Sequence, residues 1–182
     1  MRTRLCLAVA TTLLTAGCAG DPAPVAVPPV EPVTVEVAAA SSGGACTLLD
    51  FGVIEEHTGV RFDVAAASDR KDTRTCVVRA EGATLPELTL TVTDTSIDVA
   101  TFTADVQPKG AAKVSKLGRA AYRRTVAKTA KQGPAAEVGW LATDKRLVTL
   151  RWTCERGAAK ADAEELTGKL VDLAGKLDTR TR

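Results

Sequence analysis

The chain is poor in aromatic side chains and contains a single histidine. Aromatic residues make up 3% of the 182 residues: three Phe, two Trp and one Tyr. Proteins that hold bases or sugars by stacking need such rings, so the composition argues against a nucleic-acid partner. With one histidine, His57, and no Cys-x-x-Cys spacing, the chain also lacks a recognisable metal-ligand set. We therefore predict no nucleic-acid partner, no metal and no cofactor.

Catalytic signatures are also scarce. The sequence contains no Gly-x-Ser-x-Gly motif and no glycine-rich phosphate loop. His57 follows Glu55 and Glu56 near the end of an expected helix, where a positive charge interacts well with the helix dipole. A catalytic base needs a positioned partner and a nucleophile, and the sequence indicates neither, so we interpret His57 as a solvated surface residue. We predict that the protein is not an enzyme; an enzyme would require an unrecognised constellation around His57.

No stretch of the sequence is long and apolar enough for a membrane-spanning helix, which needs about 20 residues. The N-terminal run from Leu5 to Leu14 is about ten residues long and is preceded by Arg2 and Arg4. A charged start, a short apolar core and small residues before a cut site are typical of a secretory signal. We therefore expect residues 1–17 to be removed as a signal peptide.

Cys18 directly follows Ala16 and Gly17 at the end of this signal. The arrangement resembles a bacterial lipobox, in which the cysteine receives a diacylglyceryl group and becomes the new N-terminus. The third position before the cysteine is usually Leu, Val or Ile, and here it is Thr15; an ordinary secretory signal cleaved nearby is the alternative. Two acyl chains hold a protein stably on a membrane. Cys18 therefore predicts a lipid anchor to the extracytoplasmic face of the cell membrane.

Charge is balanced over the mature chain but uneven along it. Without Arg2 and Arg4 the chain carries 22 basic and 22 acidic residues, so its net charge gives no argument for nucleic-acid binding. Between Asp105 and Glu137, however, there is no acid at all. The basic residues in that interval are Lys109, Lys113, Lys116, Arg119, Arg123, Arg124, Lys128 and Lys131.

Two interpretations of this basic stretch remain open. In one, the lysines protect the edge of a sheet from pairing with other strands. In the other, a patch formed by Arg119, Arg123, Arg124 and Lys128 faces anionic headgroups, an acidic wall polymer or an acidic envelope protein. The second interpretation gives the candidate partner site of the chain.

Residues 18–45 are expected to form an extended tether. Five prolines between residues 22 and 32 block helix and disfavour a central strand, and Ser41-Ser42-Gly43-Gly44 adds a flexible end. The alternation of Val33, Val35 and Val37 leaves an edge strand as the alternative. The remaining residues 46–182 are enough for one domain with one core.

This domain is expected to be α+β. Cys46 to Gly59 is typical of a helix that stops at the glycine, and Val60 to Val64 of a short strand. Segment 96–106 fits either a strand or a helix capped by Thr95 or Ser96, and we favour the helix. Alternating apolar residues predict strands over residues 74–79, 87–93, 120–127, 137–143 and 147–155.

The C-terminal segment carries the clearest helical pattern. Apolar residues recur at three- and four-residue steps from about residue 159 to 177, at Ala163, Leu166, Leu170, Leu173 and Leu177. We therefore predict an antiparallel sheet meander with helices packed on one face, closed by a long C-terminal helix.

Three cysteines remain after Cys6 leaves with the signal and Cys18 takes the lipid. They are Cys46, Cys76 and Cys154, and only two of them can pair within one chain. We favour Cys46–Cys76, which ties the first helix to an early strand. The alternative is Cys76–Cys154, since both lie on expected strands. In the favoured pairing, Cys154 is a buried free thiol that acts as a small apolar residue.

These features together resemble a family. The stretches Cys46-Thr47-Leu48-Leu49 and Val114 to Tyr122, the second cysteine Cys76 and the final helix over 159–177 are similar to small actinobacterial lipoproteins grouped as a domain of unknown function. The resemblance covers most of residues 46–178. It implies a helix-packed antiparallel sheet of the Mog1/PsbP type and a Cys46–Cys76 disulfide, and it implies no catalytic residue. Cys154 departs from the family's two-cysteine pattern.

Anchor, tether and basic stretch lead to one expected function. We predict a lipid-anchored cell-envelope lipoprotein that serves as a non-catalytic binding or interaction module for an envelope protein or an anionic polymer. The alternative is a carrier of an apolar or lipid ligand, which needs a cavity between sheet and helices.

Overall fold

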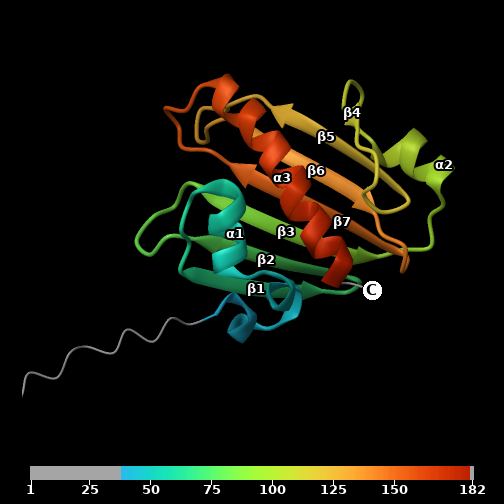
Figure 1. Cartoon of the computed structure of the whole chain (residues 1–182), viewed down its shortest axis with the longest axis horizontal. Coiled ribbons are helices and arrows are strands. Elements are labelled where there is room, and N and C mark those ends of the chain that lie inside the picture. The colour runs from blue at the N-terminus through green and yellow to red at the C-terminus, as the bar shows by residue number, and fades with distance from the viewer. Residues whose placement is uncertain (1–37, 181–182) are drawn as a thin grey trace, which may run out of the picture. The chain divides into compact units, whose positions relative to one another are not determined.

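Seven antiparallel strands form one sheet in residues 38–180, the part of the chain that this computed structural model describes (Figure 1). The strands are β1 (Val64–Arg70), β2 (Thr73–Arg79), β3 (Glu87–Asp94), β4 (Ala112–Lys113), β5 (Ala120–Val126), β6 (Ala135–Leu141) and β7 (Arg146–Thr153). Their order across the sheet is β1-β2-β3-β7-β6-β5-β4, so two meanders join where β3 pairs with β7. The predicted α+β class with an antiparallel sheet is confirmed.

Two helices cover one face of this sheet. The short helix α1 (Phe51–Thr58) and the long helix α3 (Lys160–Arg180) lie side by side across it (Figure 1). The 3₁₀ turns η1 (Ala39–Ser42) and η2 (Gly44–Leu48) precede α1, and α2 (Val99–Thr101) continues into the π-helical turn η3 (Phe102–Val106). Within the described residues, none of the helices combines the length and the apolar character that crossing a bilayer requires.

The core lies between the sheet and these two helices. The alternation in β3 places Leu88, Leu90 and Val92 against the helices, each at most 1% exposed. Leu170 and Leu173 of α3 are fully buried on the other side of the same core. Each fully buried leucine contributes about 2 kcal/mol of hydrophobic stabilisation. The predicted strand and helix periodicities are therefore confirmed for these elements.

A second, smaller cluster lies on the opposite face of the sheet. Phe102 of η3 packs against Tyr122 and Leu141, with 6.1 Å between the centroids of the Phe102 and Tyr122 rings. The prediction that the helices cover one face of the sheet is therefore correct for α1 and α3. It is wrong for the α2–η3 segment, which covers part of the other face. Segment 96–106 is helical from Val99 to Val106, as we favoured, but its cap is Asp98, whose carboxylate accepts a hydrogen bond from the Thr101 N–H at 2.8 Å.

The expectation of a flexible tether up to residue 45 is wrong at its end. Ala39 and Ala45 are 1% and 3% exposed, and the Ser42 hydroxyl donates to the Ala65 carbonyl of β1 at 2.9 Å. The folded part therefore includes residues 38–45. Alanine carries little periodic signal, so the sequence did not reveal this packing. Cys18 and the alternative strand at Val33–Val37 lie outside the described residues.

The predicted helix over 46–59 consists of two parts, η2 and α1. Asp50 separates them, because its carboxylate accepts a hydrogen bond from the Val53 N–H at 3.0 Å and so caps a new helix. Gly59 ends α1 in the left-handed conformation, as predicted. The strand predicted over 60–64 is wrong: β1 starts only at Val64, and Phe62 is buried against Trp152 with ring centroids 5.1 Å apart.

Candidate anionic-partner site

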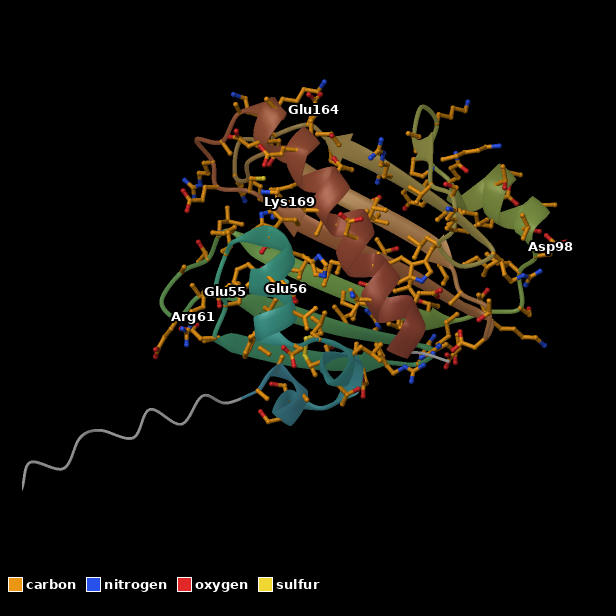
Figure 2. The ribbon with its side chains drawn as sticks, in the orientation of Figure 1. Glu55, Glu56, Arg61, Asp98, Glu164 and Lys169 are labelled. Carbon is orange, nitrogen blue, oxygen red and sulfur yellow. A yellow bond between two sulfur atoms is a disulfide. The ribbon has the colours of Figure 1, made fainter. Side chains whose placement is uncertain are left out.

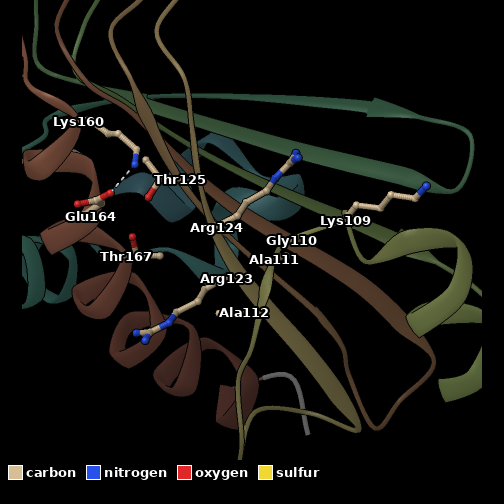
Figure 3. Close-up of a pocket in the computed structure, with 10 residues that line it drawn as sticks. All are labelled: Lys109, Gly110, Ala111, Ala112, Arg123, Arg124, Thr125, Lys160, Glu164 and Thr167. Carbon is tan, nitrogen blue, oxygen red and sulfur yellow. Dashed lines mark ion pairs between the residues drawn. The ribbon is translucent and has the colours of Figure 1, made fainter.

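A surface hollow of about 490 Å³ lies beside β5, where the short outermost strand β4 stops pairing with it (Figure 3). Its walls are residues 109–112, residues 123–125 of β5, and three residues of α3. The outermost strand β4 pairs with β5 only through Ala112 with Arg123 and Lys113 with Tyr122. Beyond Arg123, β5 therefore becomes the edge of the sheet, and the hollow opens beside it. We call this hollow the edge groove.

The edge groove is mainly basic. Four of its ten lining residues are cationic and one is acidic: Lys109, Arg123, Arg124, Lys160 and Glu164. Glu164 forms an ion pair with Lys160 at 2.8 Å, and this hydrogen bond raises the pKa of the Lys160 ammonium. Arg123 is exposed and extends toward α3, whereas Arg124 and Lys109 extend away from it (Figure 3). Because neighbouring strand residues point to opposite faces, the β5 edge carries positive charge on both sides.

Arg124 takes part in a buried charge cluster. Its Nε donates to Glu137 Oε1 at 2.7 Å, and Arg151 Nη1 donates to Glu137 Oε2 at 3.2 Å. The Tyr122 hydroxyl also donates to Glu137 Oε1, at 3.0 Å. Glu137 is only 4% exposed and lies between the two arginines in the register of β5, β6 and β7. Arg124 therefore compensates a buried carboxylate, and its charge is only partly available to a partner.

This cluster shifts the ionisation of its members. Burial, together with the negative charge of Glu137, raises the pKa of Tyr122 to about 12. The hydrogen bond to Glu137 raises the pKa of the Arg124 guanidinium. The sequence analysis missed Glu137 as a buried residue. Its burial could have been inferred from the pairing of the predicted strands, because Glu137 lies directly opposite Arg124 of β5 and Arg151 of β7.

The four basic residues predicted as one patch do not form a single cluster. Only Arg123 and Arg124 border the edge groove. Arg119 acts on Asp98, whose pKa is lowered first by the hydrogen bond from the Thr101 N–H and further by the Arg119 charge. Lys128 is exposed beyond the end of β5. Arg119 precedes β5 and Lys128 follows it, so the four residues are spread over both ends of this strand.

Figure 2 labels Asp98, on which Arg119 acts, and Glu164, which lines the edge groove. Asp98 lies beside α2, well away from Glu164 and Lys169 on α3. The edge groove is lined by Lys109 and Lys160, and Arg119 and Lys128 are not among its lining residues. Lys109 belongs to the basic stretch noted in the sequence, whereas Lys160 was missed because it lies on α3, far along the chain from β5.

The predicted disulfide Cys46–Cys76 is present and joins η2 to β2. Both cysteines are fully buried, and their Cα atoms are 4.9 Å apart. Cys154 is a buried free thiol, as predicted in the favoured pairing. Burial raises the pKa of this thiol, and the nearby Asp162 carboxylate raises it further, so the thiolate is disfavoured.

His57 is not the solvated residue that the sequence predicted. It is half-buried, and its Nε2 atom is enclosed with no hydrogen-bond partner among the described residues. Its ring lines a second hollow of about 540 Å³ between α1, α3 and the turn at residues 115–117. The other ionisable residues of this hollow are Lys116, Asp172 and Lys176. The Ser115 hydroxyl also lines this hollow.

The described part of the chain contains no group of three or more His, Cys, Asp or Glu side chains arranged to hold a metal ion. No protein family, curated protein or solved structure matches this chain. The resemblance to the actinobacterial lipoproteins therefore remains a prediction, and the functional argument depends on the residues of the edge groove.

Proposed function

We propose that the protein is a lipid-anchored lipoprotein of the cell envelope whose domain binds an anionic partner at the edge groove without catalysing a reaction. The partner is an acidic envelope protein or polymer. One observation carries the binding part of this proposal: four cationic side chains and a single acid line the edge groove, and that acid is already paired with Lys160.

Two features support export and anchoring. The N-terminal segment has the composition of a signal that ends at Cys18. The domain behind it holds a buried disulfide between Cys46 and Cys76, and disulfides persist in oxidising compartments outside the cytosol. The third cysteine of the domain is enclosed in the core and does not compete for the pair.

Anchoring is tested by replacing Cys18 with serine in the full chain. We expect the wild-type protein in the membrane fraction and the Cys18→Ser protein in the soluble envelope fraction, because the acyl chains alone hold the molecule on the bilayer. Equal membrane retention of the two proteins would contradict the lipid anchor.

Binding is tested with a polyphosphate-coated surface and the full chain in neutral detergent. Reversal of two charges, Arg123→Glu with Lys109→Glu, should weaken binding at least tenfold, and wild-type binding should fall steeply with added salt. Arg124 is left unchanged because it compensates Glu137.

The matched control reverses two exposed cations at the other edge of the sheet, Arg70→Glu with Lys71→Glu. This variant has the same net charge as the first and should bind nearly as tightly as wild type. Similar weakening in both variants would indicate a response to net charge alone and would remove the edge groove from the proposal.

The carrier alternative gains no support from the described residues. The hollow beside His57 has enough volume for a small ligand, but half of its eight lining residues are ionisable. Ligand pockets for apolar molecules are lined mainly by hydrophobic side chains. We therefore retain the binding module as the single proposed function.

A further inference from the structure

The main chain of β5 has hydrogen-bonding groups that no strand within residues 38–180 uses. The Val114 N–H donates to the Ala121 carbonyl at 3.0 Å, so the main-chain groups of Ala121 point toward β4. In an antiparallel pair, outward groups recur at every second residue. The next outward residues are Arg123, which β4 still pairs, and Thr125, which it does not.

The pairing stops because the chain turns at Gly110. Continuing the register of Ala112 with Arg123 would place Gly110 opposite Thr125. Gly110 has a φ of +79°, which departs from the extended conformation that a strand needs. Both residues line the edge groove, so none of the described residues fills the space beside Thr125.

The charges around this open edge select for acidic strands. An added strand would alternate its side chains between the side of Arg123 and Lys160 and the side of Arg124 and Lys109 (Figure 3). Basic or identical strands are repelled by these cations, as at protected sheet edges. An acidic segment meets attraction on both faces and finds the Thr125 N–H and carbonyl free to pair.

We infer that the edge groove binds an acidic, extended polypeptide segment that pairs with β5 at Thr125 and adds a strand beside it. This inference rests on the proposed function and names its partner as a polypeptide. Recognition by strand addition uses main-chain hydrogen bonds for affinity and side chains for selectivity.

The test compares two probes on the full chain in neutral detergent. One is a fluorescent peptide in which pairs of glutamates alternate with pairs of threonines, so that acids lie on both faces of a strand, and the other is polyphosphate, which has the charge but no peptide main chain. Thr125→Pro removes the outward N–H and places a ring at the edge, where proline is tolerated. We expect Thr125→Pro to weaken peptide binding about tenfold and to leave polyphosphate binding unchanged. Thr125→Val keeps the N–H and should bind the peptide like wild type.

A second measurement avoids any change to the protein. The same peptide with N-methyl groups on alternate residues retains its charges but loses its donors along one edge, so the wild-type protein should bind it about tenfold more weakly. Peptide binding should also slow hydrogen exchange of the Thr125 amide, whereas polyphosphate should not.

The outcomes separate the two proposals. If Thr125→Pro and the N-methylated peptide both bind like their unmodified counterparts while Arg123→Glu weakens both probes, strand addition is wrong and the anionic-partner function stands. If Arg123→Glu leaves both probes unaffected, the proposed function is wrong. Loss of peptide binding alone in Thr125→Pro, with polyphosphate retained, supports strand addition.

Discussion

The two halves of the sheet hold their outer layers by different chemistry. In the half formed by β1–β3, η2 is joined to β2 by the Cys46–Cys76 disulfide, and the N-terminal turns pack on β1. In the half formed by β4–β7, the long helix α3 packs on β5 and β6 without a covalent link, and a buried carboxylate, Glu137, holds three strands together on the opposite face. The disulfide fixes η2, which leads into the short helix α1 of eight residues, whereas the 21-residue helix α3 is held by packing.

We expect the largest loss of stability from removing the disulfide of the first half. The double substitution Cys46→Ser with Cys76→Ser opens a loop of 30 residues and should lower the free energy of unfolding by about 3–4 kcal/mol. Urea unfolding of the full chain measures the change. Cys154→Ala, which removes a buried thiol without a cross-link, is the control and should cost only about 1 kcal/mol. Equal losses would show that burial of sulfur, not the covalent link, stabilises the first half.

A smaller effect tests the charge cluster of the second half. Glu137→Ala leaves two guanidiniums side by side and the Tyr122 hydroxyl without its acceptor. We expect a loss of about 2 kcal/mol, less than for a fully buried pair because both arginine side chains are 36% exposed.

The control for this cluster is Glu87→Ala on the same face of the sheet. Glu87 has one arginine partner, Arg79, at 3.6 Å, and its side chain is 25% exposed. This substitution should cost well under about 1 kcal/mol. If the two glutamate variants unfold at the same urea concentration, burial of Glu137 between two arginines adds nothing to stability.

The smallest expected effect is a titration. Tyr122 is the only tyrosine of the chain, so tyrosinate absorbance reports it alone. Its pKa should be about 12 in the folded protein and near 10 after unfolding in guanidinium. Because the folded value is raised, the stability linked to Tyr122 is complete below pH 10 and is lost as the pH rises toward 12.

A glycine beside this ring sharpens the same measurement. In Gly139→Ala, the new Cβ would lie 2.5 Å from the Tyr122 ring, so the ring must shift from the position in which its hydroxyl donates to Glu137. The titration of Tyr122 should then shift back toward 10. An unchanged titration in Gly139→Ala would show that contact with Glu137 does not hold the phenol protonated.

The sequence predicted the elements whose apolar residues repeat at the period of their structure. Strands β2, β3 and β7 and helix α3 have such repeats, and their predicted ranges lie within a few residues of the observed bounds. Strand β1 was missed because all but one of its seven residues are exposed, so its sequence does not alternate. An edge strand is specified by main-chain pairing with its neighbour, which no local pattern records.

The candidate site was predictable only in part, for a related reason. The run of basic residues between Asp105 and Glu137 indicated the right strand, but the sequence did not show which side chains Arg123 and Arg124 meet on the two faces of that strand. Glu137 neutralises one of them, and Lys160 joins the other from a distant helix. Such contacts between segments far apart in the chain depend on register and packing, and these follow from the complete fold.

The N-terminal turns η1 and η2 cover the edge of the sheet that β1 forms. The chain enters the described fold at residue 38, next to β1, and η1 and η2 pack along that strand. Strand β5 lies five inter-strand spacings away, about 24 Å at 4.8 Å per spacing. The described chain therefore enters the domain at the edge of the sheet formed by β1, and Thr125 lies near the opposite edge.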